Sequence, residues 1–305
     1  MGIQFFGEYL IDRWVITPQQ LLEALDLQEY RNLKFGALAV QRGYLSEDDV
    51  ARISTQQIGQ DRRFGDLAVE MGLMTEAQVG EILTLQKNNY LYLGEALLEL
   101  GHLTEDILER ELTIFKEEQS RYGSEAVVVP EWLGARPAIE ACVDLTRKMF
   151  IRVAGLLIKT GPPEVYRDGQ SPPDGQGCST TVQVRFDGSV DIRFLLGVSH
   201  DVAVAIASRI LKEDASGESL DLVEDAVREF CNFICGNAAA RLAQQGVDTG
   251  VLPPESLSQL PRPENGSCLV RYPVHMAEGR VELDFIVPLQ RIAAARNAEG
   301  RPAPA

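Results

Sequence analysis

The chain has 305 residues, which is enough for two domains that each bury a core. Its net charge of −16 argues against a binder of duplex nucleic acid, which needs a basic face, and against an anionic membrane surface as partner. No apolar run approaches the length of a membrane span, so no membrane insertion is expected. The five cysteines, an odd number without framework spacing, indicate reduced thiols in a cytoplasmic protein.

A period of 29 residues runs through the first part of the chain. Glycines recur at this spacing, at Gly7, Gly36, Gly65 and Gly94. Hydroxyl residues suited to capping helices recur with the same step, at Thr17, Ser46, Thr75 and Thr104. In the third unit an apolar stripe at helical spacing ends at Gly72, and Thr75 with Gln78 forms a capping box for a second helix. The period predicts an all-α array of four helix-turn-helix units over residues 1–118.

Units two and three resemble the MshEN domain, the N-terminal domain of type II secretion and pilus-assembly ATPases. The resemblance rests on two 24-residue blocks that begin K-F-G and R-F-G, end at a glutamine, and are separated by IGQDR. Such blocks bind cyclic di-GMP in that family. Carried over by position, the implied nucleotide contacts are Lys34, Gly36, Gln57, Arg63, Gly65 and Gln86. Arginine beside a close-approach glycine suits a phosphate or a guanine edge, and a glutamine amide suits a base edge.

Other interpretations of this array stay open. Its Gly, Thr and Gln residues are also typical of the turns, caps and surface of a helical protein-interaction array. Phe5 and Tyr92 replace the basic residue in units one and four. The sequence leaves open whether a nucleotide site would form from units two and three or from units three and four. A scaffold for secretion or pilus partners is a further hypothesis. The chain lacks the G-x-x-x-x-G-K-[ST] loop of the ATPases that carry MshEN domains.

The period ends near residue 118, and Gly, Ser and Pro over residues 119–136 predict a linker. A second domain is predicted over residues 137–290, with the order α-β-β-α-α-β-β. Its expected elements are a helix at 138–157, strands at 179–187 and 189–197, helices at 201–211 and 220–245, and strands at 267–274 and 279–289. This order is typical of an α+β fold in which helices pack on an antiparallel sheet. Residues 291–305 are expected to be a flexible tail.

The helix predicted at 220–245 carries the most informative pattern. At about 100° per residue, one stripe is apolar and forms the expected core face, with Val223, Val227, Phe230, Ile234, Ala238 and Leu242. The opposite stripe carries Asp225, Glu229, Asn232 and Gly236. A carboxylate and a carboxamide three residues apart therefore project together. Gly236 lets a partner's backbone come close. A glycine in mid-helix lowers helix stability by about 1 kcal/mol relative to alanine, so its presence there indicates a function.

The run E-x-x-N-x-x-x-G-N-A on this helix resembles the CheX branch of the CheC/CheX/FliY phosphatases, over roughly residues 135–290. That family dephosphorylates the aspartyl phosphate of CheY-like receivers. The resemblance implies that Asn232 orients the attacking water, that Glu229 grips a receiver lysine, and that the receiver supplies Mg²⁺ while this chain binds no cofactor. CheC and FliY carry the motif twice, whereas the first helix here reads E-A-C-V from Glu140, so a single site matches CheX. CheX relatives pair through a sheet edge, which implies a homodimer.

The leading hypothesis is a two-component signalling protein of chemotaxis that dephosphorylates a CheY-like receiver, with an N-terminal module for cyclic di-GMP or protein binding. An acyl phosphate is already activated, so the phosphatase has only to place a water in line, and a neutral amide can do so without a histidine. The alternative is a non-catalytic adaptor that docks a receiver or a secretion or pilus partner. Cys231 and Cys235 are expected to be buried structural thiols rather than metal ligands.

Overall fold

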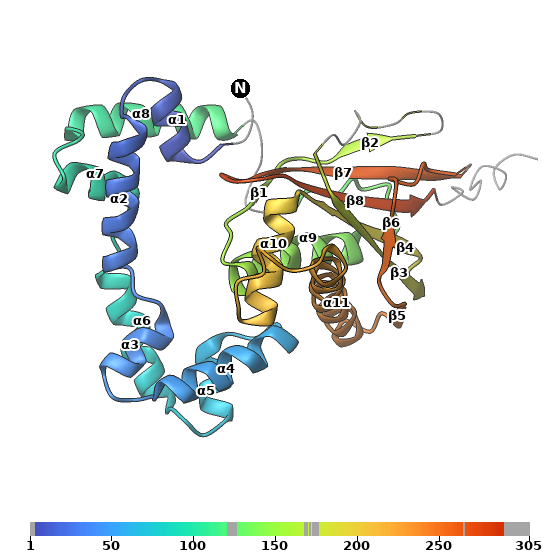
Figure 1. Cartoon of the computed structure of the whole chain (residues 1–305), viewed down its shortest axis with the longest axis horizontal. Helices are drawn as coiled ribbons and strands as arrows, with labels where there is room; N and C mark the ends of the chain where they lie inside the picture. Colours follow the sequence, from blue (N-terminus) through green and yellow to red (C-terminus); the bar gives the residue numbers. More distant parts are fainter. Residues whose placement is uncertain are drawn as a thin grey trace, which may run out of the picture.

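The computed structural model describes residues 4–120, 127–167, 170, 172, 177–264 and 266–289. Its first half is helical, and its second half is an antiparallel sheet with packed helices, as the sequence predicts (Figure 1). Among the described residues, no helix is both long enough and apolar enough to cross a bilayer. The tail predicted at 291–305 lies outside the described residues.

Short and long helices alternate through the first half. The short helices are α1 (Phe6–Asp12), α3 (Phe35–Gln41), α5 (Phe64–Glu70) and α7 (Leu93–Glu99). The long helices are α2 (Pro18–Arg31), α4 (Glu47–Gly59), α6 (Glu76–Asn88) and α8 (Glu105–Ser120). Within each kind, helix starts follow one another by 29 positions. Because α8 continues to Ser120, the helical part extends past the boundary predicted at residue 118.

The turn chemistry explains where these helices begin and end. Thr17, Ser46 and Thr75 accept hydrogen bonds from the backbone three residues on and complete capping boxes. After the short helices of units two to four, a glycine adopts a positive φ, at Gly43, Gly72 and Gly101. Trp14 takes this place in unit one with φ 59° and a 94% exposed surface.

The four units pair in a nested order rather than in sequence order. Units two and three (α3 to α6) share one apolar core and are called the inner lobe; units one and four (α1, α2, α7 and α8) share another and are called the outer lobe. The array predicted from the period would stack each unit on its sequence neighbour, whereas here unit one packs on unit four. Where the chain passes between the lobes, Asn32 Nδ2 donates to the Leu91 carbonyl at 2.8 Å and Leu91 N–H donates to Asn32 Oδ1 at 2.7 Å.

The second half contains four helical segments and eight strands among its described residues. The helical segments are α9 (Arg136–Met149), the π-turn η1 (Phe150–Ala154), α10 (His200–Leu211) and α11 (Leu220–Gln244). The strands are β1 (Lys159–Thr160), β2 (Glu164–Tyr166), β3 (Thr180–Gly188), β4 (Ile192–Val198), β5 (Thr249–Val251), β6 (Glu255–Leu257), β7 (Ser267–His275) and β8 (Val281–Pro288). All pairs are antiparallel, in the order β1-β7-β8-β4-β3-β5, with β2 on β7 and β6 on β3.

The structure differs from the sequence prediction at the end of the first helix. The helix predicted at 138–157 stops at Met149 and widens into η1, because Gly155 turns left-handed at φ 71° and donates its N–H to the Phe150 carbonyl. The short strands β1, β2, β5 and β6 lie outside the helices and strands that the sequence predicts. They pair with β7 and β3 on the edges of those strands that face away from the sheet centre.

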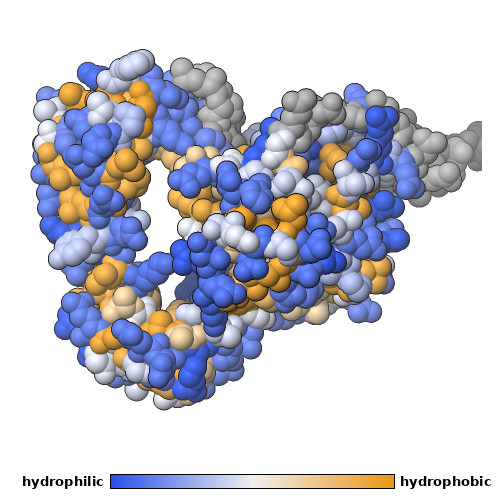
Figure 2. Space-filling model, viewed as in Figure 1, coloured by the Kyte–Doolittle hydropathy of each residue, from blue (hydrophilic) through white to orange (hydrophobic). Residues whose placement is uncertain are grey.

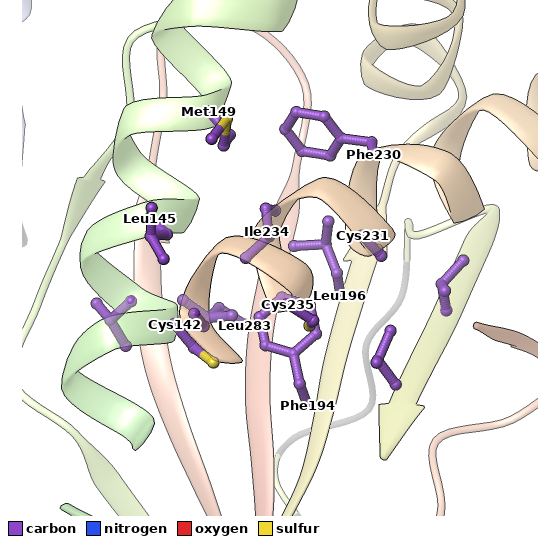
Figure 3. Packing of buried hydrophobic residues seen from close by; sticks show 14 of the residues in the cluster. Cys142, Leu145, Met149, Phe194, Leu196, Phe230, Cys231, Ile234, Cys235 and Leu283 are labelled. Atoms are coloured by element: carbon purple, nitrogen blue, oxygen red, sulfur yellow. The ribbon is translucent and has the colours of Figure 1, made fainter. Parts of the chain in front are cut away.

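Helices α9 and α11 cover one face of the sheet with a continuous core (Figure 3). Phe150 and Phe230 meet edge to face, with ring centroids 5.1 Å apart. Cys231 and Cys235 are fully buried in this core, as expected. Burial raises the pKa of both thiols, so they stay protonated and act as small apolar groups.

The helical array contacts the second domain at two separate places. From the outer lobe, Gln4 accepts a hydrogen bond through its carbonyl from Lys159 Nζ at 2.8 Å, and Glu8 lies 2.7 Å from His275 Nε2. From the inner lobe, the end of α4 lies against α11. Figure 2 shows an opening through the molecule between these two contacts. The inner lobe is therefore held beside α11, which carries the candidate site.

Candidate functional site

The apolar stripe of α11 fixes which residues the helix presents to solvent. Ser219 caps the helix by accepting a hydrogen bond from Leu222 N–H at 3.3 Å. All six members of the predicted core face are buried, namely Val223, Val227, Phe230, Ile234, Ala238 and Leu242. Because this stripe is pinned to the sheet and to α9, the opposite stripe cannot rotate away from the surface.

That opposite stripe is exposed, as predicted, and it brings the proposed catalytic pair together. Glu229, Asn232, Asp225 and Gly236 are all exposed. Asn232 Nδ2 lies 3.5 Å from Glu229 Oε2, so the carboxamide and the carboxylate share one patch of surface. A side chain added at Gly236 would meet nothing within 4 Å, so this turn of α11 is open to a close-approaching partner.

The electrostatics of this face include one residue that the sequence reasoning missed. Arg228 forms an ion pair with Asp225, so Asp225 is not free to act alone. The i, i+3 spacing of the two residues is the sequence signal that would have found the pair. Among the described residues, no group of three or more His, Cys, Asp or Glu side chains is placed to hold a metal ion.

The inner lobe flanks this face at its C-terminal end. Asn237, the residue after Gly236, is buried and donates through Nδ2 to the Ile58 carbonyl at the end of α4, at 3.3 Å. Its second donor contact is the Phe233 carbonyl at 2.8 Å. The contact between α11 and α4 therefore begins one residue after Gly236, about 100° around the helix axis from it.

The predicted nucleotide contacts are divided by the fold. A cavity of about 860 Å³ between the inner lobe and η1 is lined by Lys34, Gly36, Gln57 and Gln86. Arg63 and Gly65 do not line it. The four lining residues belong to units two and three. Of the two pairings that the sequence left open, the structure packs these two units together. The second domain contributes Ile151 and Arg152 to the cavity wall, and neither residue was predicted to lie there.

The glutamines and glycines of this set also have structural roles. Gln57 donates to the Arg62 carbonyl in the spacer after its own unit, at 2.9 Å, and Gln86 of unit three donates to the Leu33 carbonyl just before unit two, at 3.3 Å.

The glycines allow close packing between helices of one unit. A Cβ on Gly36 would lie 2.8 Å from Val50 Cγ1, and one on Gly65 would lie 2.7 Å from Val79 Cγ1. Packing of helices therefore explains both glycines without a ligand. Both lie buried inside short helices, whereas the interaction-array interpretation expected turn or surface positions.

Residues 180–265 match the family model described as chemotaxis phosphatase CheX, so this part of the chain carries a CheX-family domain. The match includes the whole of α11 and with it Glu229, Asn232 and Gly236. No curated protein sequence matches the chain.

Several solved structures are similar to the second half. CheX from Desulfovibrio desulfuricans is 20% identical, with 50% of this chain and 97% of that chain covered and a TM-score of 0.39. CheX from Vibrio vulnificus is 18% identical, with 48% and 97% covered and a TM-score of 0.41. A CheX–CheY–BeF3–Mg²⁺ complex from Borrelia burgdorferi is 21% identical, with 50% and 95% covered and a TM-score of 0.38.

Proposed function

We propose that the second domain dephosphorylates the aspartyl phosphate of a CheY-like receiver. One observation carries the proposal: Glu229 and Asn232 project together from the exposed face of α11, inside the stretch that matches the CheX family model. The fixed core face of α11 holds both side chains on a rigid element, which suits a reaction that depends on positioning.

The chemistry asks for little beyond that positioning. Water attacks the phosphorus, the bond between phosphorus and the aspartyl oxygen breaks, and the products are inorganic phosphate and free aspartate. In this proposal the Asn232 carboxamide holds the water in line, and Glu229 binds a lysine of the receiver. Mg²⁺ belongs to the receiver and offsets charge on the phosphoryl oxygens. A carboxamide does not titrate, so the placement of the water is independent of pH near neutrality.

The test is the loss of phosphate from an acyl-phosphorylated receiver, with and without the full-length chain. Asn232→Ala is expected to slow the stimulated rate by about 100-fold, because water is no longer held in line. Gln244→Ala is the matched control, since Gln244 is an exposed amide on the same helix about 18 Å further along its axis. Equal rates for the wild type and Asn232→Ala would remove the catalytic assignment.

The adaptor alternative gives a different result in the same assay. An adaptor binds the phosphorylated receiver but leaves its rate of phosphate loss unchanged. In that case Glu229→Ala and Asn232→Ala weaken receiver binding and have no other effect. The proposal that the chain forms a homodimer through its sheet is tested separately by light scattering. In the described sheet β7 is already paired with β1, β2 and β8, so a dimer would have to use other strand edges.

We further propose that the cavity beside the inner lobe binds a nucleotide such as cyclic di-GMP. The observation in favour is that Lys34, Gln57 and Gln86 meet in one cavity of a size usual for ligand sites. Phe35 and Phe64 also line it, with ring centroids 5.5 Å apart, and supply flat apolar surface for a base. Calorimetric titration with cyclic di-GMP tests this, and heat of binding that persists in Lys34→Gln would place the nucleotide elsewhere.

A further inference from the structure

The contact between the inner lobe and the second domain centres on one carboxylate. Asp61, in the turn between α4 and α5, receives three basic side chains from three different elements of the second domain. Arg152 of η1 lies 3.0 Å away and Lys148 of α9 lies 3.6 Å away, and Arg241 of α11 donates a hydrogen bond to the same carboxylate. Asp61 thus ties the array to α9, η1 and α11 together.

The charges of this cluster do not cancel. The only other carboxylate in it among the described residues is Asp144, which pairs with Arg241 at 2.7 Å and with Lys148 at 2.9 Å. Three cations therefore face two carboxylates. Partial burial acts to raise the pKa of Asp61, but hydrogen bonding and charge from the basic groups outweigh it and hold this pKa below its ordinary value. Both carboxylates stay ionised near neutral pH, and one positive charge is left over.

That surplus charge borders the cavity. Arg152 belongs both to the Asp61 cluster and to the cavity wall. Lys34 faces the cavity from the inner lobe, and none of the described residues forms an ion pair with it. One carboxylate, Glu47, also lines the cavity. An anion placed between Lys34 and Arg152 would be attracted from both sides, and each side belongs to a different domain.

The wall contributed by the second domain has features of a ligand site. Ile151 lines the cavity and is a large apolar residue that stays 51% exposed. Both Ile151 and Arg152 lie in the π-turn η1, and single π-turns occur frequently at functional sites.

We propose that this cavity is a regulatory site whose anionic, ring-bearing occupant is held by Lys34 of the array and Arg152 of the second domain, and so locks the inner lobe against α11. The inference rests on the nucleotide-binding proposal above and adds the second domain to it. A ligand that contacts both walls favours the arrangement in which both walls are in place. Because Asn237 ties α4 to α11 directly after Gly236, the lock acts one residue from the proposed phosphatase face.

Calorimetric titration of the full chain with cyclic di-GMP tests this through residues inside and outside the cavity. Arg152→Gln is expected to lower the affinity because it removes an anion contact. Arg241→Gln is expected to lower it about fivefold or more, although Arg241 does not line the cavity, because the lobe is then held less firmly and Asp61 competes harder for Arg152. Arg62→Gln is the matched control, since Arg62 pairs with Glu70 inside the inner lobe, and its affinity should equal that of the wild type.

A second readout follows the lock itself. Bound cyclic di-GMP is expected to slow amide hydrogen exchange both in residues 56–62 and in residues 237–244, on the two sides of the interface. Binding to the wild type with unchanged affinity in Arg152→Gln and in Arg241→Gln would overturn the lock while leaving the nucleotide proposal in place. No binding to the wild type would overturn both. Each failure is therefore recognised separately, and neither touches the receiver-phosphatase proposal.

Discussion

Gly236→Ala separates function from stability, because its two expected effects have opposite signs. Glycine in the interior of a helix costs about 1 kcal/mol relative to alanine. The added methyl would meet nothing within 4 Å, and Gly236 is not in the left-handed region, so no clash or strain offsets the gain. The free energy of unfolding of the second domain should therefore rise by about 1 kcal/mol, which corresponds to a rise in Tm of roughly 2–4 °C.

Receiver dephosphorylation should fall at the same time. If the receiver packs directly on Gly236, the added methyl crowds that contact at a cost of about 1–3 kcal/mol, which lowers the dephosphorylation rate roughly 5- to 150-fold.

The assays are urea denaturation and the phosphate-loss rate on the same preparations. Gly80→Ala is the control, since Gly80 is also helical and exposed, with nothing within 4 Å of an added Cβ, but lies in α6 of the array. It should be stabilising without any change in rate. An unchanged rate in Gly236→Ala would refute the close-approach reasoning, and a loss of stability would refute the open-space argument.

Two further predictions concern the array. Gly65→Ala should destabilise the inner lobe by about 1–3 kcal/mol in urea denaturation, since its Cβ would lie 2.7 Å from Val79 Cγ1; stability equal to the wild type would mean that the helices move apart freely. In the outer lobe, burial acts to raise the pKa of Glu111, but hydrogen bonds from Arg110 and the charge of Arg13 outweigh it and hold the pKa below its ordinary value of 4.5. The ionised Glu111 therefore stabilises the lobe above about pH 4.5, and this contribution is lost as the pH falls through the lower folded-state pKa. Glu111→Gln should flatten that part of the pH dependence of urea denaturation, and an unchanged acid slope would contradict the assignment.

The elements with strong periodicity were predictable from the sequence. The capping residues Thr17 and Thr75 and the apolar stripe of α11 are set by neighbours within a turn or two, so local pattern was enough to place them. The same stripe predicted that Glu229 and Asn232 lie together on the exposed side. Their chemical roles rest on the family resemblance and await the phosphate-loss assay.

What the sequence did not reveal depends on contacts between distant segments. The pairing of unit one with unit four follows from complementary apolar faces, and every unit has such faces, so the period alone cannot choose the partner. The short strands β1 and β2 exist because β7 offers them an edge, not because two or three residues have strand propensity of their own. Arg152, which lines the cavity, belongs to the π-turn η1, and the sequence pattern predicted an ordinary helix there that continues to residue 157.

The nested pairing of the units has a consequence for the order in which the chain folds. The inner lobe joins units that are adjacent in sequence, so it can close once α6 has left the ribosome. The outer lobe needs contacts between residues such as Tyr9 and Glu111, which are 102 positions from each other, and a longer loop costs more entropy to close. Until α7 and α8 are synthesised, the apolar faces of α1 and α2 have no partner. During translation α1 and α2 are therefore exposed to aggregation until α7 and α8 emerge.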